Sequence, residues 1–207
     1  MPFTLVELMV VLIIIGILMA ALAPAFNRLM TGNAVGAAER MISGQLSLAR
    51  AEAARRRCDV AIVIYDDHDY DPNLPKSSSF RAAYKPNDTW KWLPGSQETW
   101  LPTGAIVGRI VSGSSTISTV GETYPLLSDV NTPKIAITLE ESSSSVDFPA
   151  IVFKPNGRPD QAYSLSIIEA AFAPGQGMRQ LNVNYCRILE ISQYTGRVAL
   201  STLQKTP

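Results

Sequence analysis

An uninterrupted apolar stretch near the start of the chain limits the folds open to it more than any other part of the sequence. Residues 8–26 read LMVVLIIIGILMAALAPAF and contain no charged side chain. A helix of about 20 apolar residues is long enough to cross the hydrocarbon core of a bilayer. The sequence therefore predicts a helix anchored in a membrane, with the remaining residues forming one domain of ordinary size.

A cleaved secretory signal is the alternative interpretation of this stretch. A signal peptide places Lys or Arg before its apolar region and a cleavage site with small residues after it. No basic residue precedes the stretch here, and residues 27–41 (NRLMTGNAVGAAERM) continue in a helical register. The sequence thus favours a helix that stays in the protein.

One charged residue, Glu7, lies directly before the apolar stretch. A carboxylate inside a bilayer costs roughly 3 kcal/mol and usually has a partner or a function. Two interpretations are open. The side chain reaches the lipid headgroups near the end of the helix, or it pairs with a positive charge inside the membrane, such as a free N-terminal amine on Phe3 of a neighbouring chain.

The residues around Glu7 carry a family resemblance. Residues 3–12, FTLVELMVVL, resemble the prepilin motif of type IV pilins and type II secretion pseudopilins. The resemblance implies that a prepilin peptidase cuts between Pro2 and Phe3, that Phe3 is N-methylated, and that Glu7 pairs with the amine of the adjacent subunit during assembly. The family has Gly before the cut, where this chain has Pro2, and commonly has a proline near the end of the apolar helix, which Pro24 matches.

The helix is expected to continue beyond the membrane to about Arg57. Apolar residues recur there at three- and four-residue spacing, as on one face of an amphipathic helix. They are Val35, Ala38, Ile42, Leu46, Ala49 and Ala53. Pro24, Gly32 and Gly36 weaken the middle of the helix, which predicts either a kink at the membrane surface or a segment that unwinds on assembly.

Charged residues close to the end of this helix have a local interpretation. Glu52 and Arg56 are spaced for an i,i+4 ion pair. The basic run 55–57 has the composition to contact phosphates or lipid headgroups, but cations at a helix C-terminus more often complement the helix dipole. We expect the second role.

After residue 57 the pattern changes to short segments rich in β-branched residues, separated by turn residues. Eight strands are predicted, at 58–65, 80–85, 105–111, 134–139, 150–154, 164–171, 184–192 and 197–200. This spacing indicates an antiparallel sheet or sandwich, so the fold class is α+β, with the long helix packed on the β-rich part. The domain plan is a residual leader at 1–2, a transmembrane helix at 3–26, the amphipathic half of the same helix at 27–57, and a β-rich globular head at 58–207.

Four segments of the head and the adjoining helix extend the family resemblance. They are 45–56 (QLSLARAEAARR), 100–104 (WLPTG), 153–158 (FKPNGR) and 195–198 (TGRV), which resemble the GspH/FimT branch of minor pseudopilins and minor pilins. The resemblance implies a pilin-like fold and a structural subunit of a type II secretion pseudopilus or a type IV pilus. It also implies a single-pass anchor in the inner membrane, a periplasmic head, and other pilin subunits as partners.

A pilus-tip receptor for DNA uptake is the alternative function. Some FimT-like proteins bind DNA through arginines around the turn that here contains Gly196 and Arg197, and through a basic tail. Beyond Arg197, this chain has Lys205 as its one remaining cation. Because binding driven by phosphates needs several cations on one face, nucleic acid is not the expected partner. The balance of 18 basic and 18 acidic residues points the same way.

The sequence contains few residues in patterns typical of catalysis or metal binding. The only histidine, His68, lies in the acidic run 66–71 (DDHDYD). Weak candidates for metal ligands are Asp67, Asp69 and Asp71. Their spacing is that of a calcium loop, but Pro72 stands where such a loop needs glycine. The sequence has no phosphate-binding loop, GxSxG turn or zinc-spaced cysteine pair, so we expect a solvated acidic loop, no cofactor and no enzymatic activity.

Two further groups of residues leave alternatives open. In an oxidising compartment Cys58 and Cys186 could form a disulfide that closes a long loop, and otherwise they are buried thiols.

A cluster of aromatic and basic residues comprises Trp90, Trp92, Trp100, Lys85 and Lys91. Its tryptophans either pack a loop on the sheet or stack on a sugar or a base, and the first role is the more common.

Overall fold

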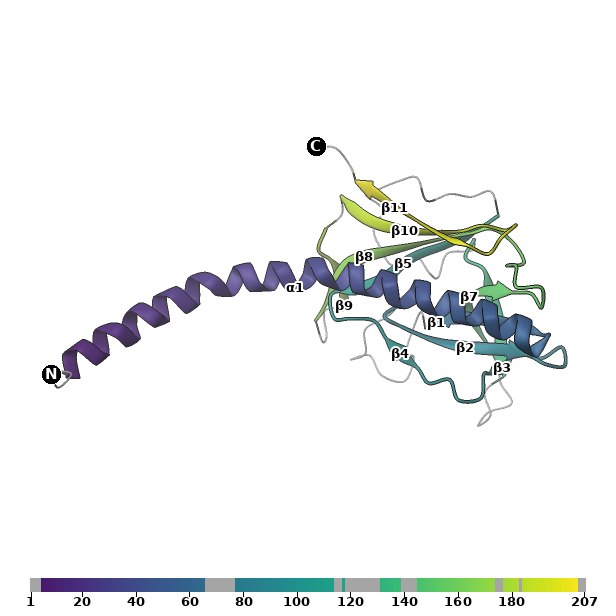
Figure 1. The fold of residues 1–207 in the computed structure, drawn as a ribbon, viewed down its shortest axis with the longest axis horizontal. Helices are drawn as coiled ribbons and strands as arrows, with labels where there is room; N and C mark the ends of the chain where they lie inside the picture. Colours follow the sequence, from purple (N-terminus) through teal and green to yellow (C-terminus); the bar gives the residue numbers. More distant parts are fainter. Residues whose placement is uncertain are drawn as a thin grey trace.

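The computed structural model describes residues 5–65, 77–113, 117, 131–138, 145–173, 177–182 and 184–204, without the side chains of residues 6, 20–32, 173, 177 and 178. Helix α1 runs from Leu5 to Arg56. Its N-terminal half extends away from the head and its C-terminal half lies across the head (Figure 1). The helix is continuous through Pro24 and follows a gentle arc. It ends one residue before the predicted position because Arg57 has a φ of 54°, a left-handed conformation that stops a helix.

Two antiparallel sheets form the head. The first sheet has the order β3-β2-β1-β7-β6, with β4 paired to β2. Its strands are β1 (Asp59–Ile64), β2 (Ser79–Lys85), β3 (Lys91–Trp92), β4 (Thr99–Trp100), β6 (Lys134–Thr138) and β7 (Ser145–Phe153). The second sheet has the order β11-β10-β8-β5, with β9 paired to β8. Its strands are β5 (Ala105–Ser112), β8 (Tyr163–Ala173), β9 (Gly177–Gln180), β10 (Tyr185–Ile191) and β11 (Val198–Gln204).

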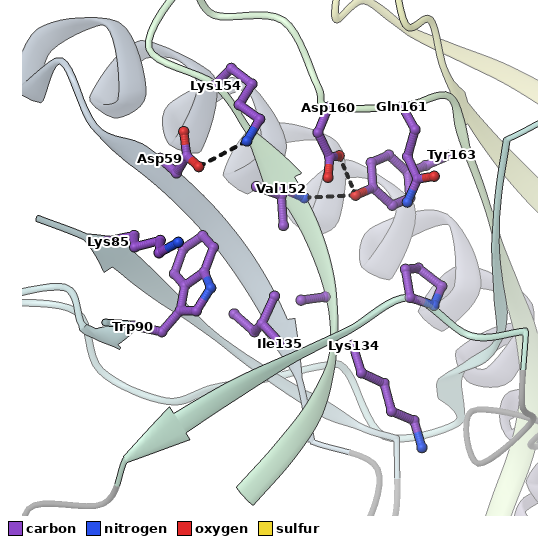
Figure 2. Close-up of a pocket in the computed structure, with 12 residues that line it drawn as sticks. Asp59, Lys85, Trp90, Lys134, Ile135, Val152, Lys154, Asp160, Gln161 and Tyr163 are labelled. Carbon is purple, nitrogen blue, oxygen red and sulfur yellow. Dashed lines mark hydrogen bonds and ion pairs between the residues drawn. The ribbon is translucent and has the colours of Figure 1, made fainter. Parts of the chain in front are cut away.

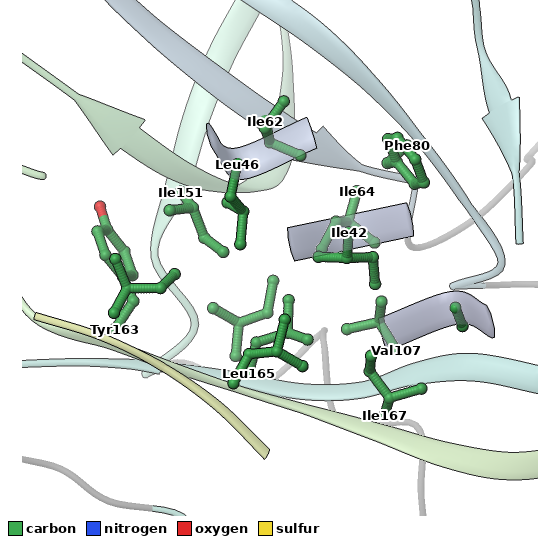
Figure 3. Packing of buried hydrophobic residues seen from close by; sticks show 14 of the residues in the cluster. Ile42, Leu46, Ile62, Ile64, Phe80, Val107, Ile151, Tyr163, Leu165 and Ile167 are labelled. Atoms are coloured by element: carbon green, nitrogen blue, oxygen red, sulfur yellow. The ribbon is translucent and has the colours of Figure 1, made fainter. Parts of the chain in front are cut away.

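The main core lies where helix α1 meets both sheets. The six predicted apolar residues of the helix face are all buried, which confirms the amphipathic pattern. Figure 3 shows Ile42 and Leu46 of α1 among side chains of both sheets, including Ile62 of β1 and Leu165 of β8. The helix therefore joins the two sheets into one head, and the α+β fold class is confirmed.

The outer faces of the two sheets have smaller cores of their own. On the first sheet, Ala61 and Val63 point away from α1 into a cluster with Ile137 and Phe148. Strand β1 is thus buried on both faces, which explains its continuous apolar run. A bridge between Trp90 and Ile137 brings the two edges of this sheet toward each other, so the sheet curls around its outer core.

All eight predicted strands are present, and three short strands are additional. Strands β3 and β4 have two residues each, too few to show an alternating pattern. Strand β9 has the sequence GMRQ, which lacks the β-branched and aromatic residues on which the prediction relies. Strand β7 begins at Ser145, earlier than predicted. Its first four residues alternate between polar (Ser145, Asp147) and apolar (Val146, Phe148) side chains, and Pro149, a residue that is rare within strands, separates them from the predicted run.

Candidate assembly site

The N-terminal half of α1 exposes apolar side chains on every side of the helix. Each large apolar side chain described between Leu5 and Met19 is at least 45% exposed. We call residues 5–19 the apolar rod. Soluble monomers rarely expose a continuous apolar surface of this extent, and a helix that is apolar all round is normally enclosed by lipid or by other helices. The apolar rod is therefore a candidate surface for assembly.

Glu7 lies in the first turn of α1, and its side chain is exposed. A carboxylate at this position interacts favourably with the positive end of the helix dipole. Pro2 and Phe3 lie outside the described residues, as does any contact between Glu7 and a neighbouring amine, so processing and pairing stay predictions. The backbone at Pro24 is helical, and its side chain is not described.

Within the described residues, the structure contains no helix that is both long and apolar enough to span a membrane.

The C-terminal half of α1 is tied to the second sheet by an ion pair that the sequence analysis missed. Of the charged residues that the structure describes, Glu39 alone is buried, at 7% exposure. Its carboxylate accepts a hydrogen bond from Arg187 on β10, and the Arg187 Nε donates to the Tyr185 hydroxyl at 2.9 Å. A signal was available, because Glu39 follows Val35 by four residues and so lies on the apolar face of the helix.

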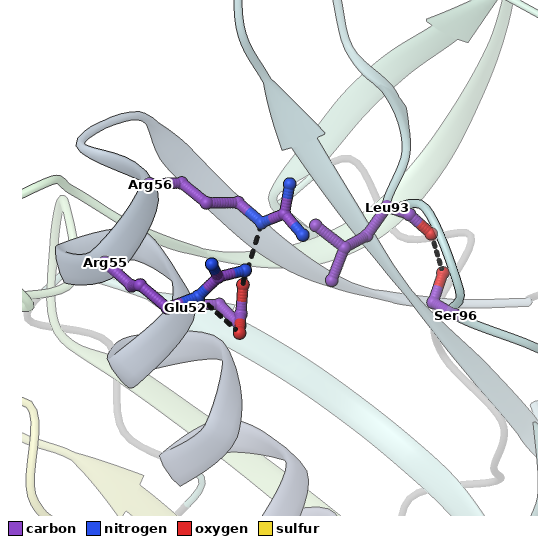
Figure 4. A network of polar contacts seen from close by, with 5 residues as sticks. All are labelled: Glu52, Arg55, Arg56, Leu93 and Ser96. Carbon is purple, nitrogen blue, oxygen red and sulfur yellow. Dashed lines mark hydrogen bonds and ion pairs between the residues drawn. The ribbon is translucent and has the colours of Figure 1, made fainter.

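The end of α1 is closed by a second group of charges, drawn in Figure 4. The Glu52 carboxylate accepts hydrogen bonds at 2.7 Å from the Arg55 Nη2 and from the Arg56 Nε. The hydrogen bonds from these two guanidinium groups lower the pKa of Glu52 to about 2, and the bond from Arg55 has the larger effect. The predicted pair between Glu52 and Arg56 is confirmed. Both arginines lie in the last turn, where a cation interacts favourably with the negative end of the helix dipole.

Two of the family-like segments meet over α1. Gly157 lies in the turn after β7, where its N–H donates to the carbonyl of Lys154 at 2.8 Å. Gly196 lies in the turn between β10 and β11, where its N–H donates to the carbonyl of Ser192 at 2.7 Å. Both glycines have positive φ and both lie close to the side chain of Arg50 on α1. One turn from each sheet therefore converges on the same point of the helix.

The two cysteines are free thiols in the structure, so the disulfide left open by the sequence is not formed. Cys58 packs against the core that faces α1, whereas Cys186 lies in the core on the outer face of the second sheet. Neighbouring side chains on a strand point to opposite faces, and Arg187 points toward the helix. Cys186 therefore points away from it, and burial raises the pKa of its thiol.

The aromatic and basic cluster divides into separate parts. Trp92 packs on the outer core of the first sheet, with ring centroids 5.8 Å from those of Tyr65 and Phe148. Trp90 lies beside this core and bridges to β6. Trp100 lies on β4 opposite Ser79 and lines a pocket to which neither Trp90 nor Trp92 contributes. The packing role expected for the tryptophans holds for Trp92.

The acidic run 66–71, with His68 and the candidate ligands Asp67, Asp69 and Asp71, lies outside the described residues. In the part of the chain that is described, no three His, Cys, Asp or Glu side chains are grouped so as to hold a metal ion.

Comparisons with known proteins give one structural likeness. No protein-family model and no curated protein matches the chain. The chain is similar to the crystal structure of the type IV minor pilin FimU from Pseudomonas aeruginosa (strain PAO1). The TM-score is 0.44 and the sequence identity is 14%, over 82% of this chain and 89% of that chain. At this level the likeness decides nothing about function.

Proposed function

We propose that the chain is a minor subunit of a filament of the type IV pilus class and acts as a structural protein, not as an enzyme. The observation that carries the proposal is the contrast between the two halves of α1. The apolar rod has no apolar partner in the described chain, whereas residues 34–53 of the same helix form the centre of the head core. Residues 5–12 of the prepilin-like segment lie at the free end of the rod.

Before assembly, the apolar rod is held in the inner membrane with the head in the periplasm. Lipid tails enclose its exposed side chains, which water solvates poorly. The apolar run continues in the sequence to Phe26, into residues whose side chains the structure does not describe. A prepilin peptidase cuts before Phe3 and leaves a free amine at the end of the rod.

During assembly, the rod leaves the lipid and packs against the rods of neighbouring subunits. Glu7 is the only charged residue of the rod. The axial offset between two subunits therefore determines whether its carboxylate lies close to a cation of the neighbouring subunit. An unpaired carboxylate in apolar surroundings costs roughly 3 kcal/mol. Pairing with the Phe3 amine of the adjacent subunit offsets this cost at one axial offset between subunits and at no other.

The head is carried rigidly by the second half of α1. The apolar face of α1, the ion pair between Glu39 and Arg187, and the two turns at Arg50 fix the head to the helix. The head then lies on the surface or at the tip of the filament. Among filaments of this class we favour the type II secretion pseudopilus, which supports protein secretion across the outer membrane, because of the GspH/FimT-like segments.

A DNA-uptake subunit is the less favoured member of the same class. Of the cations near the C-terminus, Arg187 is engaged by Glu39, and Lys205 lies outside the described residues. Arg197 is exposed in the turn before β11. Among the described residues 184–204 it is the only exposed cation, and one cation in this segment gives little phosphate-driven affinity.

The proposal is tested by placing charges on the rod. The chain with Leu12→Lys and Ile15→Lys is produced in cells that have a prepilin peptidase and the other subunits, and its head is quantified in sheared filaments. A matched control carries Leu181→Lys and Leu200→Lys, two exposed leucines of the head. We expect the rod variant to be depleted at least about tenfold, since each central lysine costs about 3 kcal/mol in lipid, and the control to assemble normally. Equal recovery of both variants would refute the proposal.

A further inference from the structure

A pocket of about 310 Å³ opens on the face of the first sheet that points away from α1 (Figure 2). Its floor is apolar and is formed by Ile135 of β6 with Ala150 and Val152 of β7. The half-buried indole of Trp90 forms one wall. The pocket thus combines an apolar floor with a rim of polar and charged side chains, and its volume lies within the range of sites for small molecules.

The pocket exists because the outer core of the curled sheet is filled at one end only. Tyr65, Trp92 and Phe148 fill that end, with ring centroids 5.5 to 5.8 Å apart. Toward the other end of β7 the smaller side chains of Ala150 and Val152 take the place of an aromatic ring. The mouth of the curled sheet is thereby left open, as in barrels that hold ligands.

The rim of the pocket combines hydrogen-bond donors and acceptors in balance. Lys154 donates to Asp59 at 3.0 Å across the mouth. Lys85 lies beside Trp90 and has a weak contact of 3.5 Å with the fully exposed Asp88. The ammonium group of Lys134 points away from the other lining residues, so the charges that face the pocket are near zero in sum.

One acceptor on the rim is held in place by a buried tyrosine. The Tyr163 hydroxyl donates to the Asp160 Oδ1 at 2.5 Å and accepts a hydrogen bond from the Val152 N–H at 3.3 Å. Burial, with the nearby Asp160 carboxylate, raises the pKa of Tyr163, so the hydroxyl stays protonated and keeps its donor role. Asp160 is therefore positioned at the edge of the pocket before any ligand arrives.

We propose that this pocket binds a neutral sugar ring. The C–H face of a pyranose packs on an aromatic ring and an apolar floor, which Trp90 and Val152 provide. Sugar hydroxyls both donate and accept hydrogen bonds, which matches a rim that carries Lys85, Lys154, Asp59 and Asp160. An inorganic anion would use neither the indole nor the two carboxylates, and a nucleotide would place its phosphates against those carboxylates.

The proposal is tested by ligand-observed NMR with the full chain in a detergent that has no sugar headgroup. The probes are glucose, N-acetylglucosamine and their β-1,4-linked dimers, with inorganic phosphate and glucuronate as anionic competitors. We expect saturable binding of at least one neutral sugar at millimolar concentration. Tighter binding of a dimer assigns the site to a glycan chain, and equal binding assigns it to a single ring. The absence of saturation by every neutral sugar below ~20 mM, or displacement by phosphate, would overturn the proposal.

Two variants with matched controls locate the binding. Trp90→Leu keeps an apolar side chain against β6 and is compared with Trp100→Leu, since Trp100 lines a different pocket. Asp160→Asn still accepts a hydrogen bond from Tyr163 and is compared with Asp147→Asn, an exposed carboxylate that does not line the pocket. We expect about tenfold weaker binding for Trp90→Leu, from the loss of stacking, and affinities within about twofold of wild type for both controls. Equal losses in a variant and its control would place the sugar elsewhere.

Discussion

Gly196, in the turn between β10 and β11, lies so close to Gly157 that a Cβ built on Gly196 would stand 2.8 Å from the carbonyl oxygen of Gly157. The φ of Gly196 is 64°, a conformation that residues with side chains rarely adopt. The close contact joins a turn of the first sheet to a turn of the second sheet, next to Arg50 of α1.

Replacing Gly196 with alanine should therefore destabilise the head. Both the backbone strain and the short contact with a main-chain atom contribute, and we expect a loss of about 1–3 kcal/mol in the free energy of unfolding. The measurement is chemical denaturation of the full chain in detergent. Gly44→Ala serves as the control, because a Cβ there meets nothing within 4 Å, and we expect it to stabilise α1 by up to about 1 kcal/mol. Equal stability of both variants would contradict this account of the two turns.

The ion pair between Glu39 and Arg187 should contribute to stability as a coupled unit. Glu39→Gln leaves the Arg187 guanidinium without its charged partner at a partly buried site, which should cost about 1–3 kcal/mol. A double-mutant cycle with Arg187→Gln checks the coupling through the free energies of unfolding. We expect the double variant to lose less than the sum of the two single losses. Strict additivity would show that the two side chains do not interact.

The apolar face of α1 was predicted from spacing, and it gives a matched pair of leucines. Leu46 is 1% exposed in the main core, whereas Leu48, two residues later, is 55% exposed. Leu46→Ala should reduce the free energy of unfolding by about 2–5 kcal/mol. Leu48→Ala should change it by less than about 0.5 kcal/mol. Comparable losses for the two substitutions would show that this helix face is assigned wrongly.

The charges at the end of α1 predict a dependence of stability on pH. Because Arg55 and Arg56 lower the pKa of Glu52 from 4.5 to about 2, the ionised carboxylate stabilises the folded state. This contribution is complete above pH 4.5 and is lost as the pH falls toward 2. The stability difference between wild type and Glu52→Gln should thus be constant near neutral pH, at roughly 0.5–1 kcal/mol for two surface pairs, and should shrink below pH 4.5. A difference that grows on acidification would contradict this pairing.

The sequence predicted those features of the fold that depend on local periodicity. The eight strands and the buried face with Ile42 and Leu46 follow from the spacing of apolar residues. The short strands β3 and β4 were missed because their pairing with β2 depends on tertiary contacts, not on any pattern of their own. The same applies to β9, which pairs with β8 through a polar segment.

The contacts between distant residues could not be predicted from one sequence. Glu39 and Arg187 are 148 positions apart, and no sequence pattern around either residue indicates that the two form an ion pair. The pocket beside Trp90 is assembled from β1, β2, β6 and β7 and from the segment before β8, so it appears only once the sheet has curled. In contrast, Glu7 and the apolar rod stand out in the sequence because a charge beside a long apolar run is rare.

The central claim is that Glu7 pairs with a cation when subunits pack through their rods. The most direct measurement is a competition between wild-type chain and Glu7→Gln, carrying different epitopes, for incorporation into filaments in the same cell. Glu52→Gln, at the far end of the same helix, is the control. We predict that Glu7→Gln is depleted in filaments at least about tenfold relative to its amount in the membrane, because loss of the pair forfeits on the order of 2–3 kcal/mol, and that Glu52→Gln is incorporated like wild type. Incorporation of Glu7→Gln in proportion to its amount in the membrane would contradict the account.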